Sequence, residues 1–249
     1  KCRMVTDGKT QTYGVNFSEI FSTVVKFSTF RMALHIAAVR DYDITAIDIS
    51  TAFLHGKIDV PNCYMQMPIG LPQYDSEGNK LVCHLKKSIY GLKQAPRIWF
   101  NHFKSSLTLF GFIQSEVDPC LFFYKKDNIV IYGLLWVDDL ILLSNDRDTR
   151  NSLITFLRDK YKLTDKGNAE WLLGMSISRD RTKHTITLSQ ELYVKNLLTR
   201  FSSYMDKSNA RSFDIPGLEE ISSFSADQGP SPGTPEHERM IPLRHVYMQ

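Results

Sequence analysis

The stretch Asn128–Asn145 reads Asn-Ile-Val-Ile-Tyr-Gly-Leu-Leu-Trp-Val-Asp-Asp-Leu-Ile-Leu-Leu-Ser-Asn, and it decides the fold of this chain. Two runs of large apolar and β-branched residues, Ile129–Val137 and Leu140–Leu143, are separated only by Asp138 and Asp139. This pattern is typical of a buried β-hairpin with two acids at its tip. The acids are the anomaly, because the strands around them are suited to a hydrophobic core.

Two adjacent carboxylates in such surroundings repel each other unless something positive lies between them, and a metal ion is the natural choice. The alternative is that Asp138-Asp139 is ordinary hairpin-turn chemistry pointing into solvent. A third acid, Asp48, lies on a second predicted strand, where Ile47 and Ile49 face one side and Asp48 the other. A lone strand Asp is commonly just solvated, but an acid on a separate strand is what a two-metal site requires.

Composition sets wide limits. The 249 residues can bury a sizeable core as one large domain or two subdomains, and the net charge of +3 names no partner. The cysteines form neither a disulfide framework nor a zinc pattern, so we interpret them as reduced, intracellular thiols. No apolar run approaches the roughly 18 residues of a membrane span, and the first residues lack a signal-peptide core. The missing initiating Met suggests a fragment.

Between Gly78 and Ser115 there are six Lys or Arg residues and no acid, interleaved with aromatic side chains. Basic groups among aromatic rings suit a sugar-phosphate backbone with stacked bases. The alternative is a helix whose basic face is solvated and whose aromatic side chains pack in the core. We favour this core role for Phe100 and Phe103. A loop end punctuated by Gly91 and Pro96 presents its polar groups well, and it carries Lys93, Gln94 and Arg97.

Spacing of apolar residues predicts helices at Ser28–Arg40 with Ser28 as N-cap, from Pro96 to a Gly111 C-cap, at Thr149–Tyr161 and at Ser189–Phe201. Strands are expected at 43–50, within 112–124, through the opening hairpin and at 171–178. The fold class is therefore α+β. From about Ser202, Pro and Gly among Ser and acids predict a linker or disordered tail, 202–249.

Several blocks in this order resemble one family, the reverse transcriptase domain of copia-type (Pseudoviridae-like) LTR retrotransposon polyproteins. The blocks are Lys1-Cys-Arg-Met-Val with Thr10-Gln11 and Tyr13-Gly-Val; Ile47-Asp-Ile-Ser-Thr-Ala-Phe-Leu-His-Gly56; Tyr64-Met-Gln-Met-Pro; Leu85-Lys-Lys-Ser-Ile-Tyr-Gly-Leu-Lys-Gln-Ala-Pro-Arg-Ile-Trp99; Trp136-Val-Asp-Asp139; Leu172-Leu-Gly-Met175; and Thr187-Leu-Ser-Gln190. The resemblance covers roughly residues 1–201, with a weaker echo at 240–247. The block from Tyr90 to Trp99 is very specific.

The resemblance implies a right-hand polymerase fold with an RRM-like antiparallel palm sheet. The fingers would be residues 1–42 and 61–97, the palm 43–60 and 98–181, and the start of the thumb 182–201. The implied activity is RNA-directed DNA polymerisation from dNTPs onto a primer 3′-hydroxyl. Implied partners are an RNA or DNA template with its primer and the rest of a Gag-Pol-like polyprotein, including integrase and RNase H, in a cytoplasmic virus-like particle or the nucleus, with no membrane.

The resemblance also assigns site residues. Asp48, Asp138 and Asp139 would be catalytic and would bind two Mg²⁺ ions, with Mn²⁺ as an alternative. Asp139 ranks below the others, because neighbours on a strand face apart unless a turn relaxes this. The nucleotide-binding residues would be Phe53, Gln94, Arg97, Lys93 and Arg3, with Phe53 blocking a ribose 2′-hydroxyl. Primer and template contacts would come from Trp136, Leu173, Gly174, Lys86 and Lys87.

The sequence departs from the family pattern at Trp136, usually Tyr, at Thr23, usually Pro, and after Ser202. The sequence also leaves two other functions open. One is a decayed fragment that keeps the palm as a nucleic-acid-binding or structural module, against which the intact acids argue. The other is a metal phosphotransferase acting on small nucleotides, which the acid-free basic stretch disfavours.

Overall fold

The computed structural model describes residues 3–168 and 171–205. The chain divides into two compact units, Lys1–Val194 and Lys195–Gln249. In the second unit the described residues belong to the end of helix α4 (Glu191–Met205). The predicted tail begins too early, because residues 202–205 are helical. Its remainder, 206–249, lies outside the described residues.

The first unit mixes helices and strands. Its helices are α1 (Phe27–Val39), α2 (Ala95–Phe110) and α3 (Arg147–Arg158), with short 3-10 helices η1 (Gly8–Thr10) and η2 (Ala52–Leu54). The strands are β1 (Asp43–Ile49), β2 (Tyr64–Gln66), β3 (Val82–His84), β4 (Ile113–Gln114), β5 (Leu121–Lys126), β6 (Ile129–Trp136), β7 (Asp139–Ser144), β8 (Leu163–Asn168), β9 (Trp171–Leu172), β10 (Met175–Asp180) and β11 (Thr185–Ser189).

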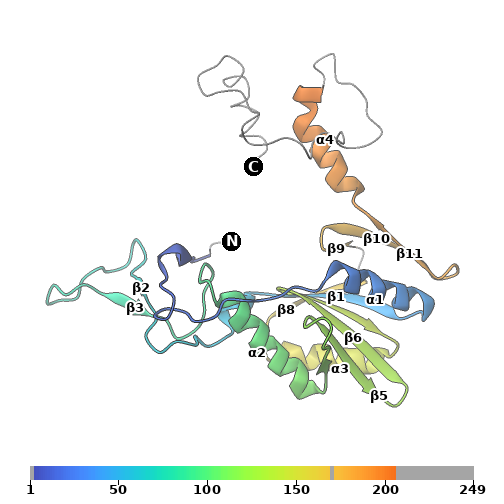
Figure 1. Ribbon diagram of the computed structural model, residues 1–249, viewed down its shortest axis with the longest axis horizontal. Coiled ribbons are helices and arrows are strands. Elements are labelled where there is room, and N and C mark those ends of the chain that lie inside the picture. Colours follow the sequence, from blue (N-terminus) through green and yellow to red (C-terminus); the bar gives the residue numbers. More distant parts are fainter. Residues whose placement is uncertain (1–2, 169–170, 206–249) are drawn as a thin grey trace. The chain divides into compact units, whose positions relative to one another are not determined.

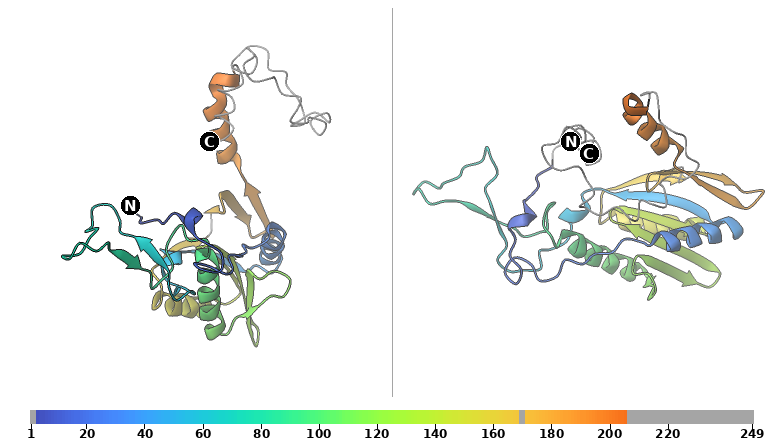
Figure 2. Two further views of the ribbon diagram at one scale, coloured as in Figure 1. Left: turned by 60° about the vertical axis from the view of Figure 1, so that its left-hand side comes forward. Right: turned by 45° about the horizontal axis from the view of Figure 1, so that its top comes forward.

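Six strands form one antiparallel sheet in the order β4-β5-β6-β7-β1-β8. Smaller antiparallel sheets join β11-β10-β9 and β2-β3. Helices α2 and α3 lie on one face of the large sheet and α1 on the other (Figure 1, Figure 2). The α+β class with antiparallel sheets is thus confirmed.

The opening hairpin is present, with a corrected tip. Strand β6 ends at Trp136, and Trp136 pairs directly with Asp139, so the two-residue turn is Val137-Asp138. The sequence placed both acids in the tip because β-branched Val137 belongs to the apolar run. In the structure Val137 takes a left-handed backbone with φ +55°, and Asp139 is the first residue of β7.

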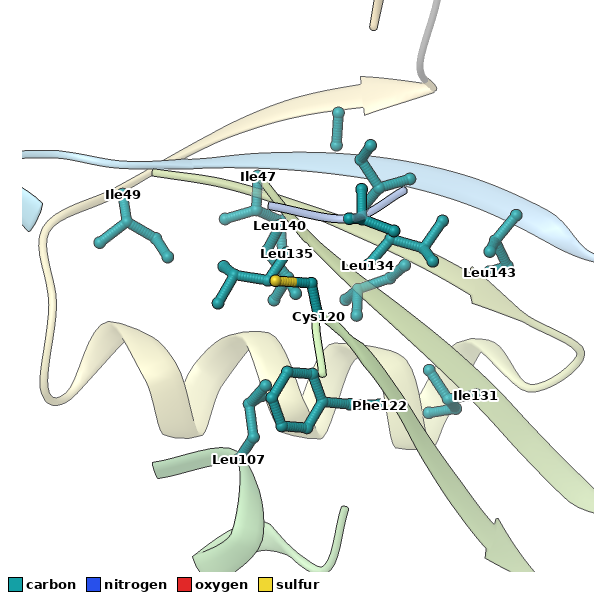
Figure 3. Packing of buried hydrophobic residues seen from close by; sticks show 14 of the residues in the cluster. Ile47, Ile49, Leu107, Cys120, Phe122, Ile131, Leu134, Leu135, Leu140 and Leu143 are labelled. Atoms are coloured by element: carbon teal, nitrogen blue, oxygen red, sulfur yellow. The ribbon is translucent and has the colours of Figure 1, made fainter. Parts of the chain in front are cut away.

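The core lies on both faces of the sheet. Strand β7 is buried at every position from Leu140 to Ser144, which explains why its apolar run does not alternate. Side chains of β1, β5, β6, β7 and α2 meet in one cluster (Figure 3). Ile47 and Ile49 are fully buried and point from β1 towards α3 (Figure 3). Asp48, between them, therefore projects from the opposite face of the sheet.

Helix ends follow local chemistry. The Asp146 side chain accepts from Thr149 N at 2.7 Å and caps α3, which begins at Arg147, two residues earlier than the predicted start at Thr149. Helix α2 has Pro96 in its first turn and ends at Gly111 with φ +114°, as predicted. The predicted Ser28 cap is wrong, because α1 begins at Phe27 and Lys26 precedes it with an extended backbone and no side-chain cap.

A separate small core supports the segment before α2. Cys63, Leu92 and Ala95 are buried together beside β2 and β3. Gly91 has φ +95°, and a Cβ there would lie 2.0 Å from the Thr6 carbonyl oxygen. Only glycine fits this approach without rearrangement. The N-terminal segment is therefore docked on the loop that leads into α2, with Thr6 N donating to Tyr90 O at 2.9 Å.

The predicted strand at 171–178 is interrupted. Strands β9 and β10 are joined by a tight turn of Leu173 (φ +51°) and Gly174 (φ +78°). Two positive φ values in a two-residue hairpin are the I′ geometry, which matches the twist of the flanking strands. Leu172 and Met175, on either side of the turn, are buried in the main core.

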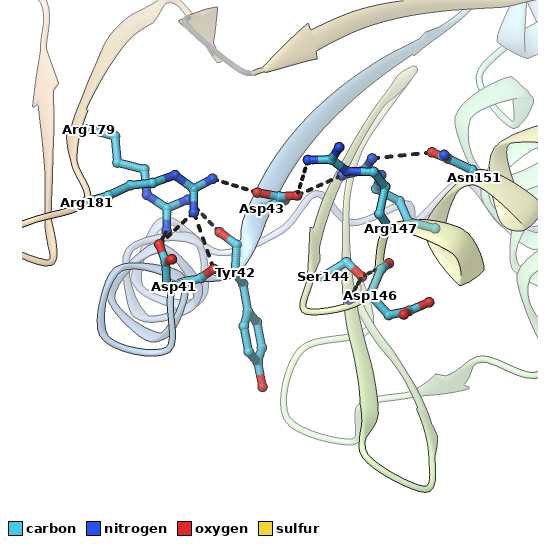
Figure 4. A network of polar contacts seen from close by, with 10 residues as sticks. Asp41, Tyr42, Asp43, Ser144, Asp146, Arg147, Asn151, Arg179 and Arg181 are labelled. Carbon is cyan, nitrogen blue, oxygen red and sulfur yellow. Dashed lines mark hydrogen bonds and ion pairs between the residues drawn. The ribbon is translucent and has the colours of Figure 1, made fainter.

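An ion-pair network joins β10 and the following turn to the corner between α1 and β1 (Figure 4). Arg181 donates to Asp41 and Asp43, each at 2.6 Å. The second carboxylate oxygen of Asp43 lies 3.4 Å from Arg150 and 3.8 Å from Arg147. Burial raises the pKa of Asp43, but the hydrogen bond and charge of Arg181, with the charges of the other arginines, outweigh it and hold that pKa below its usual range.

This shift predicts a pH-dependent contribution to stability. A carboxyl whose folded pKa is depressed stabilises the fold above its unfolded pKa, and the contribution is lost as pH falls through the folded value. We expect Asp43→Asn to lower the free energy of unfolding by about 1–2 kcal/mol at pH 6. The difference from wild type should shrink below about pH 4. Urea unfolding at pH 6 and pH 3 checks this, and an equal deficit at both values would contradict it.

The described cysteines Cys63, Cys83 and Cys120 are free thiols. Burial, with a smaller effect of Asp118, raises the pKa of Cys120 to about 12, so this thiol stays protonated at neutral pH and packs as an apolar group. Within residues 3–168 and 171–205, every helix falls short of the length and apolarity that crossing a bilayer demands.

Candidate active site

The acids on two different strands meet across a sheet. Asp48 of β1 is directly opposite Asp139 of β7. The Ile49 N–H donates to the Asp138 carbonyl at 2.8 Å, so Asp48 and Asp139 form a pair not linked by main-chain hydrogen bonds, the kind whose Cα atoms lie only about 4.5 Å apart. Opposed residues share one face of the sheet. The two carboxylates therefore project side by side.

This pairing register changes the order in which Asp138 and Asp139 rank as partners of Asp48. Strand alternation argued against Asp139, but Asp139 is the residue aligned with Asp48. Asp138 occupies the turn, where alternation does not apply, and its main chain is held by Ile49. Asp48, Asp138 and Asp139 are all half-buried. The structure thus brings the three predicted acids to one end of the β1–β7 pair.

Two β-branched residues with left-handed backbones flank these acids. Val137 has φ +55° and Thr51 has φ +57°. Such conformations cost of order 1–3 kcal/mol each and persist only where the surroundings enforce them. At Val137 the enforcing contact is visible, because the buried Trp99 donates its indole N–H to the Val137 carbonyl at 2.6 Å. Helix α2 therefore fixes the acid turn.

Phe53 lies beside the acid turn. The backbone turns after Ser50, since Thr51 is left-handed and η2 (Ala52–Leu54) follows. Phe53 packs on Tyr90 with ring centroids 5.1 Å apart. It shares a pocket of about 100 Å³ with Val137, and the other lining residues are Ser22, Thr23, Val24, Pro96, Trp99, Phe100 and Leu135.

Lys93 and Gln94 are held by the N-terminal segment. Gln94 is fully buried; its Oε1 accepts from Gln11 Nε2 and its Nε2 donates to Asn16 O, both at 2.8 Å. A nucleotide therefore cannot reach its amide here, and the predicted direct contact does not fit this geometry. Lys93 donates from Nζ to the Gln11 carbonyl at 3.2 Å and lies 4.9 Å over the ring of Phe17. Lys93 as a whole is half-exposed.

Arg97 has acidic neighbours that the sequence did not pair with it. Its guanidinium contacts Asp59, lies 3.8 Å from Glu19 Oε2, and donates to the Glu19 carbonyl at 2.9 Å. Arg3 is exposed and stacks over Tyr90 at 5.1 Å. A phosphate would therefore have to compete with the carboxylates of Asp59 and Glu19 in order to bind Arg97. At Arg3 it could bind the guanidinium without displacing the Tyr90 ring beneath it.

The predicted primer and template residues lie in two places. Trp136 is half-buried at the end of β6, opposite Asp139. Leu173 and Gly174 form the β9–β10 turn. Lys86 and Lys87 are exposed after β3, where Lys86 Nζ approaches His84 Nδ1 at 3.0 Å. The structure thus places Trp136 with the acids and the two lysines beside the small β2–β3 sheet.

The donor set fits a metal that is completed by substrate. Within the described residues, no three His, Cys, Asp or Glu side chains are arranged to hold an ion by themselves. Opposed carboxylates repel, and a divalent cation is what such a pair accommodates. Magnesium is commonly bound by one or two carboxylates together with substrate phosphates and waters. Asp48 and Asp139, with Asp138 adjacent, are carboxylates of the kind that such a partial site uses.

Sequence reasoning missed the residues that support this site. The indole of Trp99 was noted only as an aromatic among basic residues, and Gln11 and Asn16 had no assigned task. Their partners are 38, 83 and 78 residues away in sequence. No local pattern signals a contact at such separation.

Comparisons with known proteins show the family to which this chain belongs. Residues 1–216 match the family model described as reverse transcriptase (RNA-dependent DNA polymerase). The retrovirus-related Pol polyprotein from transposon TNT 1-94 of Nicotiana tabacum is 39% identical over 205 residues, covering 81% of this chain and 15% of the relative. Those from transposons RE1 and RE2 of Arabidopsis thaliana are 33% and 34% identical, each covering 80% of this chain and 13% of the relative.

The chain therefore spans about one seventh of the length of these curated relatives. The match to the family model covers most of the chain and includes all three acids and the β9–β10 turn. On this evidence, the chain belongs to the reverse transcriptase family.

Proposed function

We propose that this chain is the RNA-directed DNA polymerase segment of a longer retrotransposon Pol polyprotein, and that it extends a primer 3′-hydroxyl with dNTPs by a two-metal mechanism. The observation that carries the proposal is the Asp48–Asp139 cross-strand pair with Asp138 in the adjoining turn. Family membership supplies the reaction class. The cross-strand register, which pairs Asp48 with Asp139, supports a site for metal-assisted phosphoryl transfer.

We assign the palm to residues 43–60 and 98–181 and the fingers to 1–42 and 61–97, with 182–201 beginning the thumb. The antiparallel sheet with α2 and α3 on one face supports an RRM-like palm. The small β2–β3 sheet and the N-terminal segment docked on Gly91 support a separate finger region.

Each residue group then has a task. Asp48, Asp138 and Asp139 would hold two Mg²⁺ ions, or Mn²⁺. The bound ions would stabilise the negative charge that develops on the attacking and leaving oxygens. Trp99 fixes the acid turn through Val137, so that the carboxylates need no rearrangement during the reaction. Gln94 positions the N-terminal segment and does not contact the nucleotide itself, because its buried amide ties residues 11–16 to the start of α2.

The charged surface would hold nucleic acid. Arg3 and Lys93 each lie over an aromatic ring and keep exposed faces, while Lys86 and Lys87 extend the basic surface beside β3. Phosphate contacts of this kind position a strand without reading its sequence. Template, primer and dNTPs are the proposed substrates, and integrase and RNase H are proposed as parts of the same polyprotein, in a cytoplasmic particle or the nucleus.

A primer-extension assay on an RNA template, with purified protein and with or without Mg²⁺, tests this function. Metal-dependent addition of dNTPs supports it. Template–primer binding without extension would instead indicate the alternative, a palm kept as a nucleic-acid-binding module.

Arg97 allows a sharper test because its acidic partners are known. If Arg97 binds phosphate, Arg97→Gln should weaken template–primer affinity about tenfold at low salt and lower the slope of log affinity against log salt by about one. Asp59→Asn should do the opposite, because it releases the guanidinium from a competing carboxylate.

Filter binding across a salt titration measures both variants. If Arg97 is only structural, both variants should lower the melting temperature together, with affinity per folded molecule unchanged. That result would return Arg97 to the role of an ion-pair partner of Asp59.

A further inference from the structure

The ion-pair network around Asp41 and Asp43 joins the end of β10 to the start of β1, which is the strand that carries Asp48. This network lies at the opposite end of β10 from the Leu173–Gly174 turn. Arg179, on β10, donates to the Tyr42 carbonyl at 2.5 Å, to the Ala37 carbonyl at 3.1 Å and to Asp41 Oδ1 at 2.8 Å (Figure 4). Its guanidinium thus satisfies carbonyls at the C-terminus of α1, where cations are favoured. Only 15% of the Arg179 side chain is exposed.

The corner that receives these arginines has a defined geometry. Tyr42 N donates to Ala37 O at 3.0 Å, and Asp41 is left-handed with φ +54°. This is the Schellman arrangement, in which glycine normally takes the left-handed position. Asp41 occupies it instead and directs its carboxylate to Arg179 and Arg181. Asp41 adopts the left-handed backbone at a cost in conformational energy, and its carboxylate provides the negative charge that binds Arg179 and Arg181 of the hairpin.

Two strands run from this corner, one to Asp48 and the other to the Leu173–Gly174 turn. From Asp43, β1 extends five residues to Asp48, and from Arg179, β10 leads back five residues to Gly174. At about 3.3 Å per residue both paths are roughly 17 Å long. A small rotation of β10 at the corner therefore shifts the Leu173–Gly174 turn relative to the acids.

Apolar packing between the β9–β11 sheet and α1 is incomplete. A groove of about 580 Å³ lies between them, lined by Arg31, Leu34, His35 and Ala38 of α1 and by His184–Leu188. Leu172 and Met175 are buried in the main core at the turn end of the hairpin, whereas Ile177, Ile186 and Leu188 further along the sheet pack against that core but stay only partly buried. The ion pairs at the corner add to this partial packing, together with the His184 ring, whose Nδ1 lies 3.3 Å from the Ala38 carbonyl oxygen.

We propose that Arg179 and Arg181 are positioning residues that set the Leu173–Gly174 turn at its working distance from the Asp48–Asp139 pair. This inference rests on the proposed function and on the expectation from the family resemblance that Leu173 and Gly174 contact the primer or template. The arginines touch no substrate. They act by restricting how β10 pivots above α1, and a displacement of about 1 Å at a reacting group can cost up to about 100-fold in rate.

The test compares Arg179→Ala and Arg181→Ala with Lys183→Ala. Lys183 is a matched control, because its partner Asp180 is on the same hairpin, at 3.4 Å, and the pair does not reach the α1–β1 corner. Single-turnover primer extension with varied dNTP should show about a tenfold lower maximal rate for Arg179→Ala, with the KM for dNTP unchanged. Lys183→Ala should stay within twofold of wild type.

A second readout does not depend on activity. Amide hydrogen exchange at residues 173–176 should be faster in Arg179→Ala and Arg181→Ala, while exchange in β6 and β7 stays as in wild type. Asp41→Gly guards against a misfolded variant, since glycine suits the left-handed corner and only the carboxylate is lost. It should reproduce the faster exchange.

The outcomes separate the two proposals. If wild type does not extend primers but exchange at the turn rises in the variants, the proposed function fails and the mechanical link holds. If exchange at 173–176 is unchanged in all three variants, or if the rate falls only in proportion to the unfolded fraction, the positioning role is overturned.

Discussion

Asp48→Asn is expected to lower magnesium-dependent primer extension by roughly three orders of magnitude while leaving cooperative unfolding intact. The substitution preserves shape but removes one of the two opposed carboxylates at the end of β1. Losing a metal-binding carboxylate removes stabilisation of the charge that builds in the transition state. Core packing is spared because Asp48 projects from the face opposite Ile47 and Ile49.

Single-turnover extension and thermal unfolding on the same preparations measure this effect. Asp138→Asn should also abolish extension. Asp139→Asn tests the cross-strand register, which predicts a loss as large as that of Asp48→Asn. Near-normal extension by Asp48→Asn would sink the two-metal assignment, and loss of cooperative unfolding would show that the acids are structural.

Phe53→Val is expected to raise incorporation of ribonucleotides relative to deoxyribonucleotides by about 10- to 100-fold. The ring lies in the pocket it shares with the strained Val137 of the acid turn. A sugar bound there would bring its 2′-hydroxyl against the ring, where it would clash or lose water without gaining a partner. Valine shortens the side chain and leaves room for the hydroxyl.

Phe100 provides a matched control, because it lines the same pocket from α2 and packs on Phe122. Phe100→Val should lower the melting temperature without changing the ratio of kcat/KM values for ribonucleotides and deoxyribonucleotides. If Phe53→Val behaves in the same way, losing stability and both activities equally, its ring serves only the core.

Local pattern was sufficient for several elements of this fold. Apolar runs around Asp138-Asp139 predicted the hairpin, and Pro96 and Gly111 bounded α2, because strand propensity and helix termini depend on neighbouring residues. The family resemblance, resting on blocks in order along the chain, led to the reverse transcriptase assignment that the comparisons support.

Local sequence patterns could not predict how distant strands pair or where the backbone is strained. The sequence put Asp139 in the tip because valine normally continues a strand, whereas the Trp99 indole, 38 residues away, holds Val137 in a left-handed turn. It proposed Gln94 as a nucleotide contact, and the fold buries that amide against Gln11 and Asn16. It assigned Arg97 to a phosphate contact and did not predict that the guanidinium lies beside the acidic residues Asp59 and Glu19.

By itself, the sequence determined the main helices, the opening hairpin, the fold class and the acids that carry the proposed chemistry, since those depend on residue type and spacing along the chain. Tertiary structure alone decided which carboxylates stand opposite each other, which polar groups are consumed internally, and how Arg179 and Arg181 fasten the hairpin turn to the α1–β1 corner. The physical reason is distance in sequence: these contacts join residues far apart in the chain, and they form only once the sheet and its helices have packed.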